Sequence, residues 1–436
     1  MSKITLKAID APFRQLRINK TIAEKNSIYN GDNIILKYGN REARVQIIIN
    51  DTGTQDHLEI SRKIIKELKI DLSVQYDYRI EKKMLIIGPI IGLLYAYKDK
   101  KIARRLQKKD ERYIPYVNAI ERTGGLLFFI AEENINYKKE EIKGYVYNKD
   151  SAKWELRLLP FPAVIYRKIA TPKPKLKNIM GNKLVNPYVF DKWGFYKLTR
   201  DHPYLSSYIP ETTNIITKEK LDVLLNTYGE VFIKPTDESL GRGIFLITKE
   251  TNKYTVRKNL ENSTFYFSNR EMNSFLSKYS TNHIIQQAIK LKSYGNRKID
   301  YRVMAVRDRD NNWKCDAIMG WLGEFNGITI HSNKEVNGKS VEDMLKLQFN
   351  YNEEQIVKKV EEIKEIGKVL ASFLDRLYGP YVDFGFDFGI DELGKVWIFE
   401  ANVSQHLHCP LWINDTEMYR QVIEDIISFL NKIAMN

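Results

Sequence analysis

The sequence VFIKPTDESLGRG at residues 231–243 decides the fold of this 436-residue chain. Its hydrophobic start is typical of a strand that ends at Lys234, and a loop rich in Ser and Gly follows directly. Because glycine has no Cβ, such a loop can bring its backbone N–H groups close to phosphate oxygens, and Lys234 adds a positive charge. The stretch lacks the GxxxxGK[ST] spacing of a P-loop. A hairpin turn with an incidental lysine is the alternative interpretation.

Two carboxylates and an amide gather near the end of the chain, in the segments GFDFG (385–389) and WIFEAN (397–402). Asp387 lies among aromatic residues, and Glu400 and Asn402 share one face of a predicted strand because they are two residues apart. Apolar flanks make a buried charge costly unless it is paired or binds a cation. Carboxylate and amide oxygens suit Mg²⁺, which also takes oxygens from nucleotide phosphates. A solvated hairpin face is the alternative.

A third polar segment, KIDYRVM, spans residues 298–304. Strand alternation places Asp300 and Arg302 on one face, opposite Tyr301 and Val303. An arginine that faces a phosphate site can neutralise the charge that develops on a transferring phosphoryl group. Taken alone, the segment is better explained by a surface ion pair.

Taken in chain order, these segments resemble the ATP-grasp superfamily, and in particular its YheC/YheD-type branch, which is described as endospore coat-associated. The superfamily resemblance covers roughly residues 180–436, and the branch resemblance extends more weakly to the N-terminus. Each motif is loose, but their order along the chain is specific. The motifs are Phe190–Trp193, Leu205–Pro210 with Thr212, Val231–Pro235, Gly241–Ile244 and, upstream, Leu85–Gly92.

The resemblance implies that the chain binds ATP and Mg²⁺ through particular side chains. Lys192 and Lys234 would reach the ATP phosphates, and Arg302 would lie near the γ-phosphate, so that Lys234 and Arg302 are the predicted catalytic residues. The other implied residues are Ser239, Gly241, Arg242 and Gly243 in the phosphate loop, Gln287, Ala288 and Ile289 beside the adenine, and Asp387, Glu400 and Asn402 as Mg²⁺ ligands.

The sequence departs from the family pattern in three places. The segment Lys290–Gly295 has no carboxylate for the ribose, and His331–Gly338 matches the family's Asn and Gly-Gly segment poorly. The residues after Asn402 lack the common Pro-Gly. His406 and His408 follow there and would either contact the substrate or serve no chemistry, whereas Cys409 is expected to be buried rather than nucleophilic.

The predicted fold class is α/β (α+β). An ATP-grasp fold of two α/β lobes follows an α/β pre-grasp domain and a small β-rich N-terminal domain, either a barrel or a sandwich. We expect these domains at residues 1–83, 84–178 and 179–436. The apolar run Met84–Tyr97 is too short to span a bilayer, and its Gly-Pro pair indicates a buried strand followed by a turn.

Composition sets limits on partners and location. Lys and Arg number 69 against 55 Asp and Glu, a net charge of +14, which attracts an acidic peptide or anionic polymer but is equally explained by solvated lysines. Only two cysteines occur, and the N-terminus lacks the apolar segment of a secretory signal, so we expect a cytoplasmic protein without a membrane span. The branch resemblance adds spore association and sporulation.

The predicted function is an ADP-forming, ATP-dependent ligase that joins a carboxylate to an amine through an acyl-phosphate, with a peptide or anionic polymer as candidate substrate. A spore-coat-associated structural protein that binds ATP without catalysis is the alternative. Nucleic acid is the least favoured partner, because no RRM, KH or zinc-finger signature occurs. A homodimer is expected only by analogy with other ATP-grasp enzymes.

Overall fold

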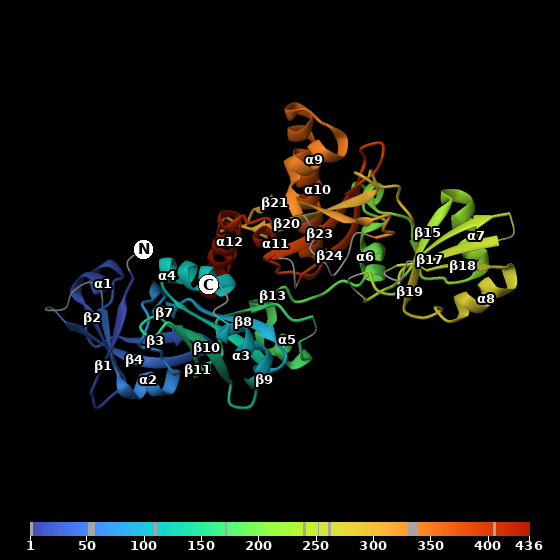
Figure 1. The fold of residues 1–436 in the computed structure, drawn as a ribbon. Coiled ribbons are helices and arrows are strands. Elements are labelled where there is room, and N and C mark those ends of the chain that lie inside the picture. The colour runs from blue at the N-terminus through green and yellow to red at the C-terminus, as the bar shows by residue number, and fades with distance from the viewer. Residues whose placement is uncertain are drawn as a thin grey trace.

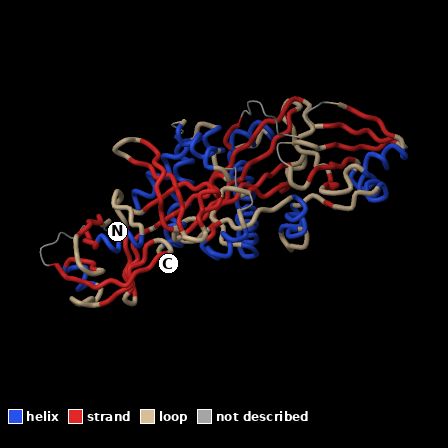
Figure 2. The backbone as a smooth tube through the Cα atoms, turned by 90° about the horizontal axis from the view of Figure 1, so that it is seen from below, coloured by secondary structure: helices blue, strands red, loops and turns tan. Residues whose placement is uncertain are grey.

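The computed structural model describes residues 3–50, 57–108, 111–170, 172–238, 241–251, 253–259, 263–329, 338–403 and 407–436. Helices and strands alternate along the chain, as an α/β protein requires, and the strands form four sheets. Figure 1 shows an elongated molecule, with the N-terminal sheet at one end and the sheet that carries β15 and β17 at the other. Figure 2, seen from below, shows strands along the whole length with helices on their flanks.

The first sheet closes on itself. Its order is β1-β5-β2-β4-β3-β7-β6, and the backbone of Ile4, next to β1, exchanges hydrogen bonds of 2.8 and 2.9 Å with Tyr76, next to β6. Apolar side chains from every strand fill or line the interior, those of β6 being partly buried, so this region is a barrel, one of the two forms that the sequence left open. The elements are β1 (Thr5–Ile9), β2 (Gln15–Asn19), α1 (Lys20–Lys25), β3 (Asn33–Tyr38), β4 (Arg41–Asn50), β5 (His57–Ser61), α2 (Arg62–Leu68), β6 (Asp77–Glu81) and β7 (Met84–Gly88).

The sequence predicted one strand and a turn for the apolar run Met84–Tyr97, and this prediction is wrong. It forms two strands, β7 (Met84–Gly88) in the first sheet and β8 (Ile90–Ala96) in the second. Proline has no N–H to donate to a ladder, so Pro89 interrupts the pairing, and the chain changes sheets there. The predicted domain boundaries remain predictions, but the strand pairing keeps Met84–Gly88 with the barrel.

The second sheet has the order β11-β10-β9-β8-β12-β13, and β9, β8, β12 and β13 run parallel. Parallel strands need helical cover on both faces, which explains their nearly unbroken apolar sequences. The C-terminal helix packs against α4 here, far from its neighbours in sequence. The elements are β8 (Ile90–Ala96), α3 (Asp99–Gln107), α4 (Ile114–Thr123), β9 (Leu126–Asn136), β10 (Glu141–Asn148), β11 (Lys153–Pro160), β12 (Val164–Arg167), α5 (Pro174–Met180), β13 (Leu184–Val185) and α12 (Thr416–Ala434).

The third sheet, with order β14-β19-β15-β16-β17-β18, is antiparallel, and we call it the first lobe. Helices α7 and α8 cover one of its faces through an apolar cluster that includes Leu221, Val231 and Met272. The elements are α6 (Lys192–Thr199), β14 (Thr212–Thr213), α7 (Lys218–Tyr228), β15 (Glu230–Pro235), β16 (Phe245–Glu250), β17 (Lys253–Lys258), β18 (Thr264–Phe267), α8 (Asn269–Ser277) and β19 (His283–Gln287).

The fourth sheet, with order β22-β21-β20-β23-β24, forms the second lobe. The long helix α10 begins at an Asn352 capping box and covers the face that carries Tyr301 and Val303. The opposite face, which carries Met304 and Trp321, is turned towards the second sheet and α12. The elements are β20 (Arg297–Arg307), β21 (Trp313–Phe325), β22 (Gly338–Ser340), α9 (Val341–Phe349), α10 (Glu353–Tyr378), β23 (Asp383–Ile390), β24 (Val396–Asn402) and α11 (Cys409–Trp412).

A buried polar cluster joins the second sheet to the second lobe. Asp383, at the start of β23, accepts hydrogen bonds from the Tyr166 hydroxyl at 2.7 Å and from the Asn186 amide at 2.6 Å. The Lys168 ammonium lies 3.3 Å from the same carboxylate, and the two side chains are 4% and 0% exposed. Arg167 alongside donates to backbone carbonyls of the connecting chain, including that of Tyr188. Buried charges are tolerated only when they are paired in this way.

Candidate functional site

The first lobe positions Lys234 by strand alternation. Val231 and Ile233 of β15 point into the apolar cluster under α7 and α8, so Phe232 and Lys234 point to the opposite face, towards the second lobe. Lys234 is 9% exposed, which is unusual for a lysine. Its environment must therefore supply acceptors.

Lys234 is held by neutral groups. Its ammonium donates to the Gln286 carbonyl oxygen on β19 at 2.5 Å, and the Gln286 amide donates to the Thr212 hydroxyl at 2.8 Å. Burial, followed by the nearby charge of Lys192, lowers the pKa of Lys234 to about 7, against the weaker opposing effect of Glu400 and Asp387. A buried lysine of this kind gains its full charge when an anion arrives.

The second lysine reaches the same place from a helix start. Asp191 caps α6 by accepting from the Gly194 N–H at 2.5 Å, and Lys192 is the first helical residue. The Lys192 ammonium donates to the carbonyl oxygen of Glu238 at 2.6 Å and lies 4.0 Å from the Glu400 carboxylate. Lys192 therefore connects the loop after β15 to the second lobe.

The second lobe contributes an ion pair. The Arg302 guanidinium on β20 donates to the Asp387 carboxylate on β23 at 2.7 Å, and these two residues are directly opposite in the strand pairing. Burial alone would lower the pKa of Arg302, but Asp387 raises it above its ordinary value. Arg302 is thus a permanent cation in this site, although its charge is compensated before any ligand binds.

The predicted metal ligands lie together on β23 and β24. Asp387 pairs with Glu400 across the two strands, and the Asn402 amide lies 3.3 Å from the second Asp387 oxygen. Two carboxylates and one amide oxygen are the hard donors that Mg²⁺ prefers, so the donor chemistry fits that ion. Among the residues that the structure describes, no group of three or more His, Cys, Asp or Glu could hold a metal.

The glycine-rich loop is partly described. Gly241 and Gly243 adopt positive φ angles of 69° and 65°, which only glycine adopts readily, and Ser239 lies outside the described residues. A Cβ on Gly243 would lie 2.9 Å from the Pro235 ring. The Asn259 amide, just after β17, donates to the Gly241 carbonyl at 2.8 Å and so anchors the turn that contains Arg242.

The residues predicted to contact adenine form the end of β19 and the chain beyond it. The Gln287 N–H donates to the Glu211 carbonyl at 2.8 Å, and the Ala288 N–H to the Glu230 carbonyl at 3.1 Å. Ala288 and Ile289 are 8% and 9% exposed. Ala288 belongs to one buried apolar cluster with Leu246, Ile328 and Phe232, which come from both lobes. An apolar setting of this kind suits a base.

Of the remaining candidates, His408 and Cys409 lie within the described residues. The imidazole Nε2 of His408 is 3.1 Å from the Tyr95 hydroxyl on β8, so this histidine contacts the second sheet. Burial raises the pKa of the Cys409 thiol to about 11, so Cys409 is buried, as predicted. His406 lies outside the described residues, as does the segment from His331 to Asn337.

Sequence reasoning gave no role to the side chains of Gln286 and Thr212. Both are almost fully buried, and Gln286 lies opposite Phe232 in the strand pairing, on the same face as Lys234. The available signal was alternation: Gln286 and Gln287 are adjacent, so only one of them can face Lys234. Lys298 was also passed over. Its ammonium donates to the Ile328 carbonyl at 2.9 Å.

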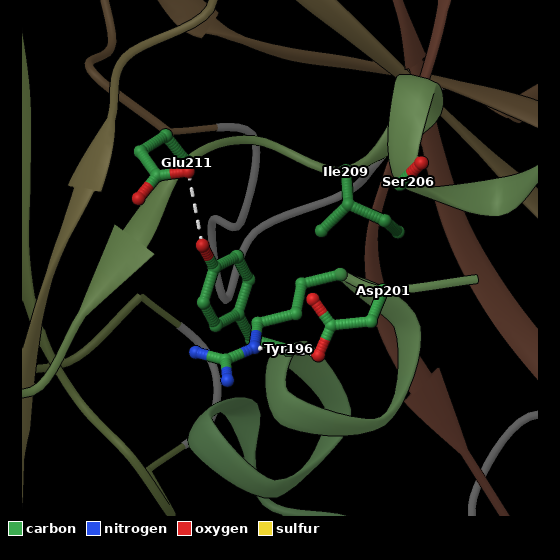
Figure 3. Close-up of a pocket in the computed structure, with 6 residues that line it drawn as sticks. Tyr196, Asp201, Ser206, Ile209 and Glu211 are labelled. Carbon is green, nitrogen blue, oxygen red and sulfur yellow. Dashed lines mark hydrogen bonds and ion pairs between the residues drawn. The ribbon is translucent and has the colours of Figure 1, made fainter. Parts of the chain in front are cut away.

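A cavity of about 250 Å³ lies beside α6, and Glu211, the backbone partner of Gln287, forms part of its wall (Figure 3). Within it the Tyr196 hydroxyl donates to the Glu211 carboxylate at 2.9 Å, as the dashed line marks. The lining residues are Tyr196, Arg200, Asp201, Ser206, Ile209 and Glu211. None of the predicted site residues lines this cavity.

Three known proteins illustrate what this chain is similar to. YheD of Bacillus subtilis, an endospore coat-associated protein, is 28% identical over 373 residues, which is 79% of this chain and 80% of that protein. YheC of the same organism, also endospore coat-associated, is 20% identical over 278 residues, covering 60% of this chain and 75% of that protein. A solved structure, D-alanyl-alanine synthetase A from Vibrio cholerae, aligns with 80% of this chain and 98% of its own at 11% identity and a TM-score of 0.43.

The described helices include none that is both long enough and apolar enough to cross a membrane. The profile of the YheC/D like ATP-grasp family matches residues 181–433, more than half of the chain and the whole of the region that holds both lobes. The chain belongs to the YheC/D like ATP-grasp family.

Proposed function

We propose that this protein is an ATP-dependent, ADP-forming ligase that joins a carboxylate to an amine through an acyl-phosphate. One observation carries the proposal: Lys192, which binds the loop after β15, lies 4.0 Å from Glu400 of the second lobe. Two lysines of the first lobe and the carboxylates of the second lobe therefore lie near one another where the lobes meet. Family membership supports the same reading.

The cations have distinct parts in this proposal. Lys192 and Lys234 bind the phosphates of ATP from the first lobe, and the backbone around Gly241 and Gly243 closes over them. Arg302 faces the γ-phosphate from the second lobe. Fixed, buried cations stabilise the charge that builds up on a transferring phosphoryl group, because little solvent must reorganise around them during the reaction.

Asp387, Glu400 and Asn402 would hold Mg²⁺. When bound, the ion supplies charge neutralisation for the phosphate oxygens. The protein's own contribution is to fix these three oxygen donors on adjacent strands, where Asp387 and Glu400 lie directly opposite each other in the strand register. Arg302 donates to the Asp387 carboxylate at 2.7 Å and so fixes its orientation.

The chemistry needs no protein nucleophile. The substrate carboxylate attacks the γ-phosphorus, the bond to the β-phosphate oxygen breaks, and ADP leaves with that oxygen. The amine then attacks the acyl carbon, and phosphate leaves with the former carboxylate oxygen, while the amine loses a proton. Cys409, the cysteine nearest the site, is buried with a raised thiol pKa, so it is unsuited to attack.

The substrate is proposed only as a class. A peptide or anionic polymer fits the net charge of +14, and the coat association of YheC and YheD leads us to propose that this protein also acts in sporulation and associates with the spore. A coat-associated protein that binds ATP without ligation is the competing proposal. The two differ in whether any acceptor stimulates phosphate release.

The proposal is tested by measuring phosphate released from Mg-ATP against a panel of amino acids, peptides and anionic polymers. We expect one carboxylate and amine pair to stimulate release, and Lys234→Ala and Glu400→Ala to abolish it while the proteins stay folded by circular dichroism. Stimulated turnover that persists in both variants would refute the site. Nucleotide binding without stimulated release would favour the structural role.

A further inference from the structure

The hydrogen bonds around Lys234 have only one possible direction. The Thr212 hydroxyl lies 2.9 Å from the Pro210 carbonyl, which can only accept, so the hydroxyl donates there and accepts from Gln286. The Gln286 amide nitrogen therefore faces Thr212, and its carbonyl oxygen faces the Lys234 ammonium, which can only donate. The orientation of the glutamine amide follows from the whole chain of bonds rather than from a single contact.

This chain of hydrogen bonds spans three neighbouring strands, and its three residues are buried. Thr212 is on β14, Gln286 on β19 and Lys234 on β15, and their exposed fractions are 2%, 5% and 9%. A buried polar chain is stabilising only when every member is satisfied. Because each strand fixes one member, the Lys234 ammonium has little freedom to move away from the face that looks towards the second lobe.

The charges around Lys234 come from three elements. Lys192 on α6 repels its ammonium, and Glu400 on β24 and Asp387 on β23 attract it. Asp387 is already paired with Arg302, and Glu400 lies near Lys192. The direct partner Gln286 holds the ammonium without a charge of its own. An acidic residue in its place would compete with any anionic ligand for Lys234.

We infer that Gln286, supported by Thr212, is a positioning residue that aims the Lys234 ammonium at the ATP phosphates and leaves its charge uncompensated for them. The inference rests on the proposed function, in which Lys234 binds those phosphates. It deepens that proposal by assigning a polar side chain that the motif residues do not include. Gln286 acts through Lys234 and is not itself assigned to the reacting atoms.

The test is the pH dependence of Mg-ATP binding, measured by isothermal titration calorimetry. The range from about pH 5.5 to about pH 9 brackets the pH at which a buried lysine with a lowered pKa loses its proton. Affinity should fall towards high pH as Lys234 of the free protein loses its proton. Gln286→Leu removes the acceptor, so we expect affinity near neutral pH to fall at least tenfold and the decline to begin at lower pH.

Two further variants sharpen the test. Gln286→Glu keeps an acceptor and adds a negative charge, so the decline should begin at higher pH. Thr212→Val frees the far end of the glutamine, so it should shift the decline in the same direction as Gln286→Leu, but less. Gln355→Glu is the matched control, because Gln355 is exposed at the start of α10 and a glutamate serves that capping box equally well.

Each outcome decides the matter. Opposite shifts for Gln286→Leu and Gln286→Glu, with none for Gln355→Glu, would establish the positioning role. If the Gln286 variants change only thermal stability and leave the pH profile unmoved, Gln286 is a packing residue and the inference is wrong. If the unmodified protein binds no Mg-ATP at any pH while it remains folded, the proposed function fails together with it.

Discussion

The two lobes hold their cations in opposite ways. In the first lobe the Lys234 ammonium has a neutral amide oxygen as its partner, whereas Lys192 donates to a backbone carbonyl and also lies 4.0 Å from the Glu400 carboxylate. In the second lobe Arg302 is bound directly to the Asp387 carboxylate. A neutral partner leaves a cation's charge available to a ligand, whereas a carboxylate compensates it. Under the proposed function, the first lobe supplies the affinity for phosphate, and the second lobe supplies charge only when Asp387 acquires another partner.

The largest effect is expected from breaking the pair in the second lobe. Arg302→Leu leaves Asp387 buried without its cation, so unfolding free energy should fall by about 3 kcal/mol. Urea denaturation measures this change. The double variant Arg302→Leu/Asp387→Leu should recover most of the loss, since both charges are gone. A single variant as stable as the unmodified protein would show that the pair is not held in the folded state.

The same experiment in the first lobe should give the reverse result. Lys234→Met removes a buried cation that only neutral groups contact, so stability should be unchanged or rise by up to about 1 kcal/mol. Mg-ATP binding, measured by calorimetry, should fall at least a hundredfold. A loss of stability comparable to that of Arg302→Leu would mean that the two lobes do not differ in the way described.

Stability should also depend on pH through Lys234. Its pKa is about 7 in the folded chain and 10.5 ordinarily, so between these values the unfolded chain binds more protons and stability rises with pH. Below about pH 7 the buried charge destabilises the folded state fully. The unfolding free energy of the unmodified protein should therefore rise relative to that of Lys234→Met between about pH 7 and about pH 10. A constant difference across that range would contradict the lowered pKa.

The smallest effect concerns the glycine-rich loop. Gly243→Ala and Gly229→Ala both place a side chain at positive φ, 65° and 78°, and each should cost about 1 kcal/mol. Only Gly243→Ala brings a Cβ against Pro235, whereas Gly229 has open space. We expect both to lower the melting temperature, but only Gly243→Ala to weaken Mg-ATP binding. Equal binding by the two variants would separate the loop from the nucleotide.

The fold was largely predictable because hydrophobic periodicity marks its elements. The strands predicted to carry Arg302 and Glu400 are confirmed as β20 (Arg297–Arg307) and β24 (Val396–Asn402). The run Met84–Tyr97 was misread, since continuous apolar sequence does not reveal which sheet a strand joins. The proline within it was the signal that the pairing changes.

The candidate site was predictable where a motif contains the residue. It was not predictable where a hydrogen-bond partner comes from a strand distant in sequence. Lys234, Asp387 and Glu400 each stand out against apolar flanks. Gln286 does not, because its importance depends on an ammonium 52 positions earlier in the chain. Which of two adjacent glutamines faces Lys234 is decided by strand register, and that requires the pairing of β15 with β19. The assigned roles themselves remain predictions.

The buried cluster around Asp383 has a consequence for how this protein can be divided or recombined. A fragment that begins at residue 179 keeps Asp383 and Asn186 but loses Tyr166 and Lys168, which are two of the partners of that carboxylate. A chimera that takes the second sheet from a relative inherits the same problem unless both residues come with it. The residues that surround Asp383 must therefore be kept together in any fragment or chimera. A cut in the connecting chain does not separate two independent modules.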